Sequence, residues 1–215
     1  MKQEKETAGK AGIGISGVIL AGGVNKRFNG LTKSNIVIDG KKIITRITDT
    51  LKDIFNEIII VTNNPDEFKE FSNYRIIPDQ YLNVGPLGGI HAALKSSSNE
   101  TVFIFAGDMP LLDKEIIIRQ IEYYKTHKCD ILIPRINSNI EPLHAIYNIS
   151  VISVLEKYLS MNHDYAVREF FKNVNVGIME MDDSDEISKA FTNINTPDDI
   201  SIFSNFISVK KLKTL

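Results

Sequence analysis

The sequence predicts a Rossmann-like α/β fold, that is, a doubly wound, mostly parallel sheet with helices on both faces. Short, continuous apolar runs recur along the chain, as expected of strands that are buried on both faces. Helical patterns stand between these runs, and such alternation favours a parallel strand order. The composition agrees, because 43% of the 215 residues are hydrophobic and 24% are charged, as in a globular domain.

Four strands are expected in the first half of the chain. They are Ile15–Leu20, Ile58–Val61, Arg75–Pro78 and Val102–Phe105. A helix should follow the second strand, because Asn64 can act as its N-cap, Pro65 suits the first helical position and Glu67 can close a capping box. Another helix is expected over Leu87–Lys95.

The second half continues this alternation as far as Pro134, and the pattern of strands and helices changes after that residue. Asp113 should cap a helix that runs to about Lys125, with one apolar face. The other expected elements are strands at Ile131–Ile133 and Leu143–Tyr147, helices at about 150–160 and 164–172, an edge strand at Val174–Met179 and a helix start at Thr196–Asp199. With no repeat or low-complexity linker, residues 15–215 are predicted to form one domain and residues 1–14 a flexible tail.

Charge and cysteine content exclude several classes of function. The net charge of −2 gives no basic face for nucleic acid. The only cysteine, Cys129, rules out an internal disulfide and a cysteine-cluster metal site. No apolar stretch could span a bilayer, and the polar N-terminal residues do not resemble a signal peptide. We therefore expect a cytoplasmic protein that is not bound to membranes.

The segment from Leu20 to Lys33, with the sequence LAGGVNKRFNGLTK, is the most informative one. Gly22 and Gly23 allow a tight turn that brings backbone N–H groups close to a ligand. Positive charge follows at Lys26, Arg27 and Lys33. A glycine-containing, cationic loop at the carboxyl end of a strand suits a polyphosphate.

This region has three other interpretations. A P-loop requires glycine directly before its lysine, whereas Thr32 precedes Lys33. The segment Gly12–Gly17 matches the dinucleotide pattern G-x-G-x-x-G, but it precedes a strand instead of following one, so it is a chance match. An ordinary strand-to-helix turn that is rich in surface charge stays open as the third interpretation.

A second cluster, Gly-Asp-Met-Pro, follows the fourth strand and contains Asp108. Ligands of open α/β sheets bind at the carboxyl ends of strands where the strand order reverses. A carboxylate that faces a phosphate loop can bind Mg²⁺, which keeps several waters and needs few protein ligands. The alternative is that Asp108 only caps a turn before Pro110.

The third cluster comprises Asp79 and the segment GPLGGI, which begins at Gly85, Pro86 and Leu87. Adjacent glycines at a helix start could let a base or a ribose approach bare backbone. Asp79 could accept hydrogen bonds from ribose hydroxyls or from a base. The alternatives are close packing of the helix on the sheet and an exposed aspartate in a turn.

Taken in order, these motifs resemble the molybdenum cofactor guanylyltransferase family from about Ile15 to Ile200. The resemblance is carried by LAGG at 20–23, the Lys26–Arg27 pair, Lys33, Pro78–Asp79, GPLGGI at 85–90, GDMP at 107–110, EPL at 141–143 and NINTPD at 193–198. The chain departs from the family pattern at Phe28, where Met is usual, and at Thr32, where Asp is usual.

The resemblance implies transfer of GMP from Mg-GTP to molybdenum–molybdopterin, with release of pyrophosphate. It implies catalytic roles for Arg27, Lys33 and Asp108, with Asp108 as the Mg²⁺ ligand. It also implies substrate contacts by Leu20, Ala21, Gly22, Gly23, Lys33, Asp79, Gly85, Pro86, Leu87, Asp108, Asn193 and Asn195. The implied partners are GTP, molybdenum–molybdopterin and the proteins of molybdenum insertion and molybdoenzyme maturation.

Residues 15–112 are predicted to bind the nucleotide and residues 113–208 the acceptor. An acceptor phosphate is ionised at neutral pH and needs no general base, so His144 is expected to be a strand residue near the acceptor pocket and not an acid or base. Two other functions stay open. One is a different nucleotidyltransferase, for a cytidylyl or a sugar-phosphate substrate, and the other is a non-catalytic nucleotide- or cofactor-binding protein.

Overall fold

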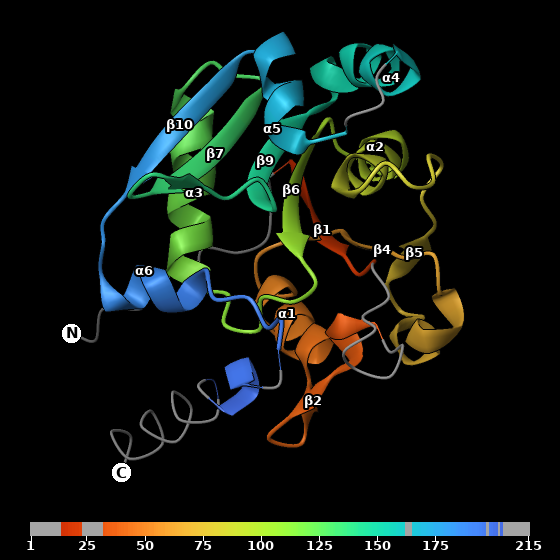
Figure 1. Ribbon diagram of the computed structural model, residues 1–215, viewed down its shortest axis with the longest axis vertical. Helices are drawn as coiled ribbons and strands as arrows, with labels where there is room; N and C mark the ends of the chain where they lie inside the picture. Colours follow the sequence, from red (N-terminus) through yellow and green to blue (C-terminus); the bar gives the residue numbers. More distant parts are fainter. Residues whose placement is uncertain (1–13, 23–31, 162–164, 197, 202, 204–215) are drawn as a thin grey trace, which may run out of the picture.

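The structure is a computed structural model that describes residues 14–22, 32–161, 165–196, 198–201 and 203 of the chain. Residues 1–13 of the predicted tail and the stretch 23–31 lie outside these residues. Eight strands form the central sheet, in the order β10-β7-β9-β6-β1-β4-β5, and β8 pairs with β7 (Figure 1). Their bounds are β1 Ile15–Leu20, β4 Ile58–Val61, β5 Arg75–Ile77, β6 Thr101–Ala106, β7 Ile131–Ile136, β8 Asn139–Ile140, β9 His144–Asn148 and β10 Val176–Met181.

Most strand pairs are parallel, as the sequence predicts. In register, Leu20 at the end of β1 lies opposite Val61 of β4 and Ala106 of β6. β9 is antiparallel to both of its neighbours, β6 and β7, while β10 runs parallel to β7 at the sheet edge. The chain moves from β1 through β4 to β5 on one side and then returns to place β6 on the other side of β1. The strand order therefore reverses between β1 and β6, where doubly wound sheets bind ligands.

Helices cover both faces of the sheet, which confirms the predicted layering. The described helices are α1 Ile43–Leu51, α2 Pro86–Ser96, α3 Lys114–Thr126, α4 Ile152–Met161, α5 Val167–Phe170 and α6 Asp185–Ala190. Apolar side chains of α1, α3 and α6 share one buried cluster with Phe103 and Phe105 of β6. Those of α2 and α4 share the other with Val102 and Ile104. Alternate residues of β6 thus point to opposite faces, as the strand geometry requires.

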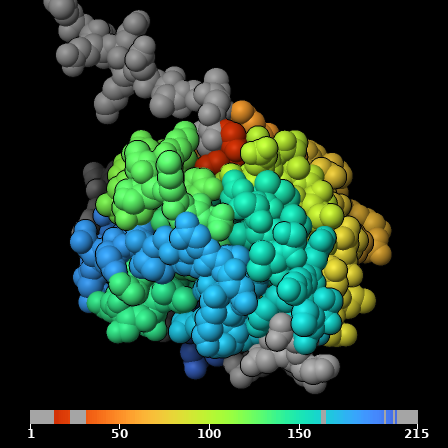
Figure 2. All heavy atoms as spheres, turned by 90° about the horizontal axis from the view of Figure 1, so that it is seen from above, coloured from red at the N-terminus to blue at the C-terminus, as the bar shows by residue number. Residues whose placement is uncertain are grey.

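The two halves of the chain share this sheet, because β9 and β7 continue it beyond β6. In the space-filling view, second-half segments, coloured green to blue, form most of the visible face, and first-half segments lie along its edge (Figure 2).

Asp113 caps α3 as predicted, since its Oδ1 accepts from the N–H groups of Glu115 and Ile116 at 2.8 and 3.1 Å. Within the described residues, no helix is long and apolar enough to cross a membrane.

The predicted capping box after β4 is wrong. Pro65 does begin a helical segment, but this is the 3-10 helix η3 (Pro65–Phe71), and the Asn64 side chain does not cap it. The backbone of Asn64, with φ −122° and ψ 65°, departs from the extended conformation that an N-cap residue adopts. The carboxylate of Glu67 instead accepts hydrogen bonds from Thr32 and Asn35, which are far away in the sequence.

Sequence reasoning did not identify α1, which has the sequence IITRITDTL. Its isoleucines and threonines are β-branched and have low intrinsic helix propensity. The helix forms because Ile43, Ile44, Ile47 and Leu51 are fully buried against the sheet. Burial of one face supplies the stabilisation that local propensity lacks. Before α1, the strands β2 (Val37–Ile38) and β3 (Lys41–Lys42) form a small hairpin.

His144 begins β9, as a strand residue, but its side chain lies in the core and not in a pocket. The imidazole is fully buried, with Phe103 and Phe105 packed edge-on against it and Phe191 beside it. Its ring nitrogens have no hydrogen-bond partner among the described residues. Burial lowers the pKa of His144 from 6.5 to about 3, so the ring is neutral in the folded protein.

The buried imidazole should make the protein sensitive to acid. Below pH 6.5 the unfolded chain binds a proton at His144 that the folded chain excludes until about pH 3. Between these values, this site should lower the free energy of unfolding by about 1.4 kcal/mol for each pH unit of acidification. Urea unfolding of His144→Phe at several pH values should show a shallower loss than the wild type. His127→Phe, at an exposed histidine, is the matched control, and equal slopes for wild type and His144→Phe would contradict the assignment.

Candidate active site

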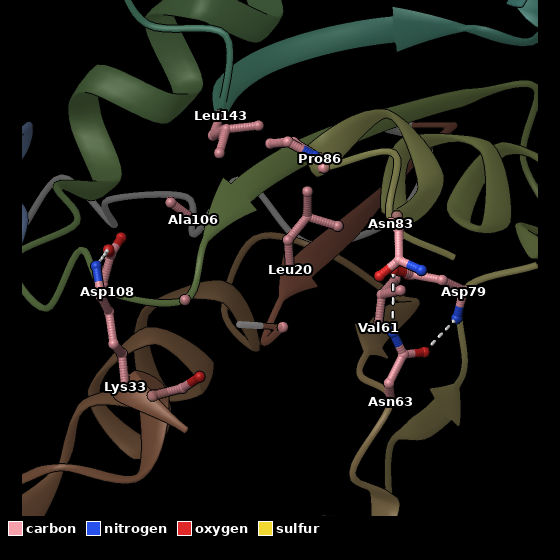
Figure 3. A pocket seen from close by; sticks show the side chains of 15 residues that line it. Leu20, Lys33, Val61, Asn63, Asp79, Asn83, Pro86, Ala106, Asp108 and Leu143 are labelled. Carbon is pink, nitrogen blue, oxygen red and sulfur yellow. Dashed lines mark hydrogen bonds and ion pairs between the residues drawn. The ribbon is translucent and has the colours of Figure 1, made fainter. Parts of the chain in front are cut away.

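A cavity of about 550 Å³ opens at the carboxyl ends of β1, β4 and β6 (Figure 3). Its lining combines small apolar surfaces with a few polar side chains. The lining residues are Leu20, Gly22, Lys33, Ser34, Val61, Asn63, Asp79, Asn83, Gly85, Pro86, Gly89, Ala106, Gly107, Asp108 and Leu143. The cavity therefore lies at the reversal of strand order, and all three predicted motif clusters contribute to it.

The loops after β1 and β6 meet at the floor of the cavity. The N–H of Gly107 donates to the carbonyl oxygen of Leu20 at 3.1 Å. A Cβ atom on Gly107 would lie 2.7 Å from that oxygen and 2.9 Å from the Ser34 hydroxyl. Only glycine allows the two loops to approach this closely, and the approach brings Asp108 to the loop that follows β1.

At one end of the cavity, Lys33 lies between two oxygen acceptors. Its ammonium Nζ is 2.9 Å from Oδ2 of Asp108, and it also donates to Oδ1 of Asn195. Both members of the ion pair are largely shielded, with side-chain exposures of 27% for Lys33 and 19% for Asp108. Residues from the two halves of the chain, 162 positions apart, therefore form one polar cluster.

The segment that carries Asn195 is held by its own hydrogen bonds. The N–H of Ile194 donates to the carbonyl oxygen of Asp108 at 2.8 Å. The carboxylate of Asp199 accepts from the N–H groups of Asn195 and Thr196 at 2.7 and 2.8 Å. These backbone bonds lower the pKa of Asp199 below its usual value. Residues 198–201 are helical, as the Thr196 signature predicts, and Pro197 lies outside the described residues.

At the opposite end of the cavity, Asp79 pairs with Asn63 (Figure 3). The amide of Asn63 donates to Oδ2 of Asp79 at 3.3 Å, and its oxygen accepts from the Asp79 N–H at 3.0 Å. Burial raises the pKa of Asp79 above its usual value. Sequence reasoning missed Asn63, although its position just after β4 was a usable signal. Asn83, with a left-handed φ of 63°, lines the same end.

The glycines at the start of α2 serve packing as well as the cavity. Gly85 precedes the helix with φ 61° and ψ −149°, a conformation that only glycine adopts readily. A Cβ on Gly88 would lie 2.5 Å from the carbonyl oxygen of Tyr81. Gly89 does line the cavity, but it also packs against Leu20. Leu87, one of the predicted contact residues, is fully buried in the core and does not line the cavity.

Other predicted residues lie elsewhere or are not described. Gly23 and Arg27 fall in the stretch 23–31, outside the described residues. Ala21 is buried, and only its backbone could reach a ligand. Asn193 is half-buried and lies two residues before Asn195 in the C-terminal segment. The cavity lining from the second half of the chain is Leu143, next to Glu141, whose pKa is raised by burial.

The oxygen atoms near Lys33 suit a hard cation better than a transition metal. Among the described residues, no group of three or more His, Cys, Asp or Glu side chains could hold a metal ion. The Lys33 ammonium group contacts one carboxylate oxygen, of Asp108, and one amide oxygen, of Asn195. Such a sparse, all-oxygen set fits Mg²⁺, which binds one or two carboxylates and completes its shell with water and phosphate oxygens.

The fold and the cavity together define a nucleotide-binding domain of the doubly wound α/β class. Comparison with known proteins agrees with this assignment. Residues 17–177 match the MobA-like NTP transferase domain. A probable molybdenum cofactor guanylyltransferase of Natranaerobius thermophilus is 36% identical over 194 residues, which cover 86% of this chain and 93% of the relative. The molybdenum cofactor guanylyltransferase of Desulfosudis oleivorans is 31% identical over 191 residues, covering 86% and 92%.

A solved structure extends the agreement to the fold. Molybdopterin-guanine dinucleotide biosynthesis protein A of Archaeoglobus fulgidus has a TM-score of 0.77 and 26% identity, over 90% of this chain and 98% of the other. The chain thus belongs to the molybdenum cofactor guanylyltransferase family and is a nucleotidyltransferase. The family resemblance inferred from the motifs is confirmed.

The contact at Gly107 generates a prediction about stability. Gly107→Ala should lower the free energy of unfolding by about 1–3 kcal/mol, because its Cβ would clash with backbone that cannot move aside easily. Chemical denaturation measures the change. Gly22→Ala is the matched control, since a Cβ there meets nothing within 4 Å. A Gly107→Ala protein as stable as the wild type would show that the two loops do not need this close approach.

Proposed function

We propose that this protein transfers GMP from Mg-GTP to the terminal phosphate of molybdenum–molybdopterin and releases pyrophosphate. The curated relatives support the reaction by their names. The observation that carries the proposal is the polarity of the cavity: Lys33 and Asp108 line one end, where Asn195 contacts Lys33, and Asn63 and Asp79 line the other. A nucleoside triphosphate has the same division between a charged end and a hydrogen-bonding end.

The end formed by Asn63 and Asp79 suits the nucleoside. A half-buried carboxylate can accept hydrogen bonds from ribose hydroxyls or from the ring N–H and amino groups of guanine. The Asn63 amide holds Asp79 in place from two sides. Pro86 and Gly89 also line the cavity. The nucleoside is thus recognised by few polar groups in a mostly preformed site.

The end formed by Lys33 suits the triphosphate. An ammonium group there can bind phosphate oxygens in place of the Asp108 carboxylate that it contacts in this structure. Arg27, from the segment before Thr32, is proposed to add a second cation. The loop glycines, Gly22 and Gly23, would offer backbone N–H groups to the same phosphates.

The proposed reaction requires positioning more than proton transfer. An oxygen of the acceptor phosphate attacks the α-phosphorus of GTP, and a new P–O bond forms. The bond from the α-phosphorus to the bridging oxygen breaks, and pyrophosphate leaves with the electron pair. Because the acceptor is already ionised, the protein contributes alignment of two anions and stabilisation of negative charge. The neutral, buried His144 is consistent with a reaction that uses no histidine base.

Asp108, with Asn195 beside it, would hold Mg²⁺ in this proposal. The ion would neutralise charge on the phosphates. Asn195 then serves both halves of the reaction, because its oxygen also accepts from Lys33. Asn193 and the neighbourhood of Leu143 are proposed to contact the acceptor. In this proposal residues 15–112 bind the nucleotide and residues 113–208 the acceptor, and Asn195 is the residue of the second half that would also act at the nucleotide.

A panel of nucleoside triphosphates tests the proposal. With Mg²⁺, GTP should raise the melting temperature more than ATP, CTP or UTP, because binding to the folded state adds to its stability. With molybdenum–molybdopterin as acceptor, GTP should also yield pyrophosphate and the guanine dinucleotide in equal amounts. A preference for CTP would favour a cytidylyltransferase. Binding without pyrophosphate release would favour a non-catalytic role.

Replacement of the proposed metal ligand gives a sharper prediction. Asp108→Asn should lower turnover by at least about 10²-fold, because the neutral amide holds Mg²⁺ poorly at the reacting phosphates. The melting temperature should stay close to that of the wild type. Asp183→Asn, at an exposed carboxylate outside the cavity lining, is the matched control. Turnover by Asp108→Asn at the wild-type rate would show that Asp108 is not the Mg²⁺ ligand of the reaction.

A further inference from the structure

The carboxylate of Glu67 lies behind the turn that carries Lys33. Glu67 belongs to η3, the 3-10 helix after β4, and is separated from Lys33 by 34 positions. Its Oε2 accepts from the backbone N–H of Thr32 at 3.2 Å and from Nδ2 of Asn35 at 3.1 Å. The Asn35 amide is also 3.4 Å from the backbone carbonyl oxygen of Glu67. One side chain therefore binds both ends of the segment Thr32–Asn35.

This segment is a single tight turn. The N–H of Asn35 donates to the carbonyl oxygen of Thr32 at 2.9 Å, and the N–H of Ile36 donates to that of Lys33 at 3.0 Å. Thr32 is fully buried and Asn35 is 8% exposed, so the ends of the turn are packed. Lys33 is its first 3-10 residue, and its side chain leaves the turn toward the cavity. The orientation of the ammonium group therefore depends on the orientation of the turn.

We infer that Glu67 is a positioning residue for nucleotidyl transfer, which acts by fixing the Thr32–Asn35 turn so that Lys33 points into the cavity. Glu67 does not line the cavity and would touch neither substrate. Its effect is transmitted through the N–H of Thr32, directly before Lys33. A charged acceptor suits this task, because hydrogen bonds to an ionised oxygen are stronger than those between neutral groups. The inference rests on the proposed role of Lys33 at the triphosphate.

The same helix provides a control. Asp66 precedes Glu67, is exposed, and forms an ion pair with Lys69 in its own helix. Asp66→Ala removes a carboxylate of η3 but leaves the turn untouched. The charge on this part of the surface changes equally in Asp66→Ala and Glu67→Ala, so a difference between them reports on the hydrogen bonds of Glu67.

A double-mutant cycle between Glu67 and Lys33 tests the inference. Calorimetry measures the Kd of GTP in the presence of Mg²⁺ for wild type, Glu67→Ala, Lys33→Ala and the double variant. Each single substitution should weaken binding by roughly tenfold, and the double variant should be little weaker than Lys33→Ala. In transfer assays, Glu67→Ala should raise the KM for GTP more than it lowers kcat. A merely structural defect would lower kcat with the folded fraction and leave KM unchanged.

Two conservative variants complete the experiment and cover the case in which Glu67→Ala does not fold. Glu67→Gln keeps an oxygen within reach of Thr32 and Asn35 and should bind GTP within about threefold of wild type. Glu67→Asp keeps the charge but is too short, and it should resemble Glu67→Ala.

The results separate the inference from the proposed function. Additive effects in the cycle, or a wild-type Kd for Glu67→Asp, would overturn the role of Glu67 while leaving Lys33 in place. A wild-type Kd for Lys33→Ala would overturn both, because Glu67 would have nothing to position. If another triphosphate replaces GTP as the preferred ligand, the same cycle with that nucleotide tests Glu67 in the same way.

Discussion

The close contact between the ends of β1 and β6 determines where the charged groups of the cavity lie. These two central, parallel strands end in register, with Leu20 opposite Ala106. The bond from the Gly107 N–H to the Leu20 carbonyl oxygen continues this pairing for one more residue. Asp108 is the next residue, so the sheet itself presents the carboxylate to the loop after β1. A side chain at position 107 would separate the two loops.

Segments that are distant in the sequence converge on Lys33. Asp108 and Asn195 contact its ammonium group, and Glu67 holds the turn from which it extends. Asp199, in turn, holds the backbone of Asn195. Most of these bonds join a charged group to another polar group at partly exposed positions, where each contributes modestly to stability. Their common effect is to restrict the geometry of one cation, as the proposed triphosphate site requires.

The two ends of the cavity differ in how they are built. The end at Asp79 and Asn63 depends on short loops directly after β4 and β5, so its polar groups come from neighbouring strands of one half of the sheet. The end at Lys33 combines loops of β1 and β6 with the C-terminal segment. Changes in the C-terminal segment can therefore reach the Lys33 end directly, whereas the hydrogen bonds between Asn63 and Asp79 join residues of the first half of the chain.

The sequence by itself determined the class of fold, the positions of most strands and the identity of the motif residues. Continuous apolar runs are visible in the sequence because strands that are buried on both faces need them. Glycine motifs are visible because the conformation of Gly85 and the close contact at Gly107 exclude other residues. Asp113 was identifiable as a cap because capping is a local interaction within three residues.

Only the tertiary structure decided the remaining features, because each depends on contacts between distant residues. The helix α1 forms through burial of β-branched side chains that local propensity disfavours. Glu67 reads locally as half of a capping box, yet its carboxylate bonds to Thr32 and Asn35. His144 reads as a polar strand residue, yet it is enclosed by aromatic rings. Local patterns record what a residue can do, and the packing of the sheet determines which partner it meets.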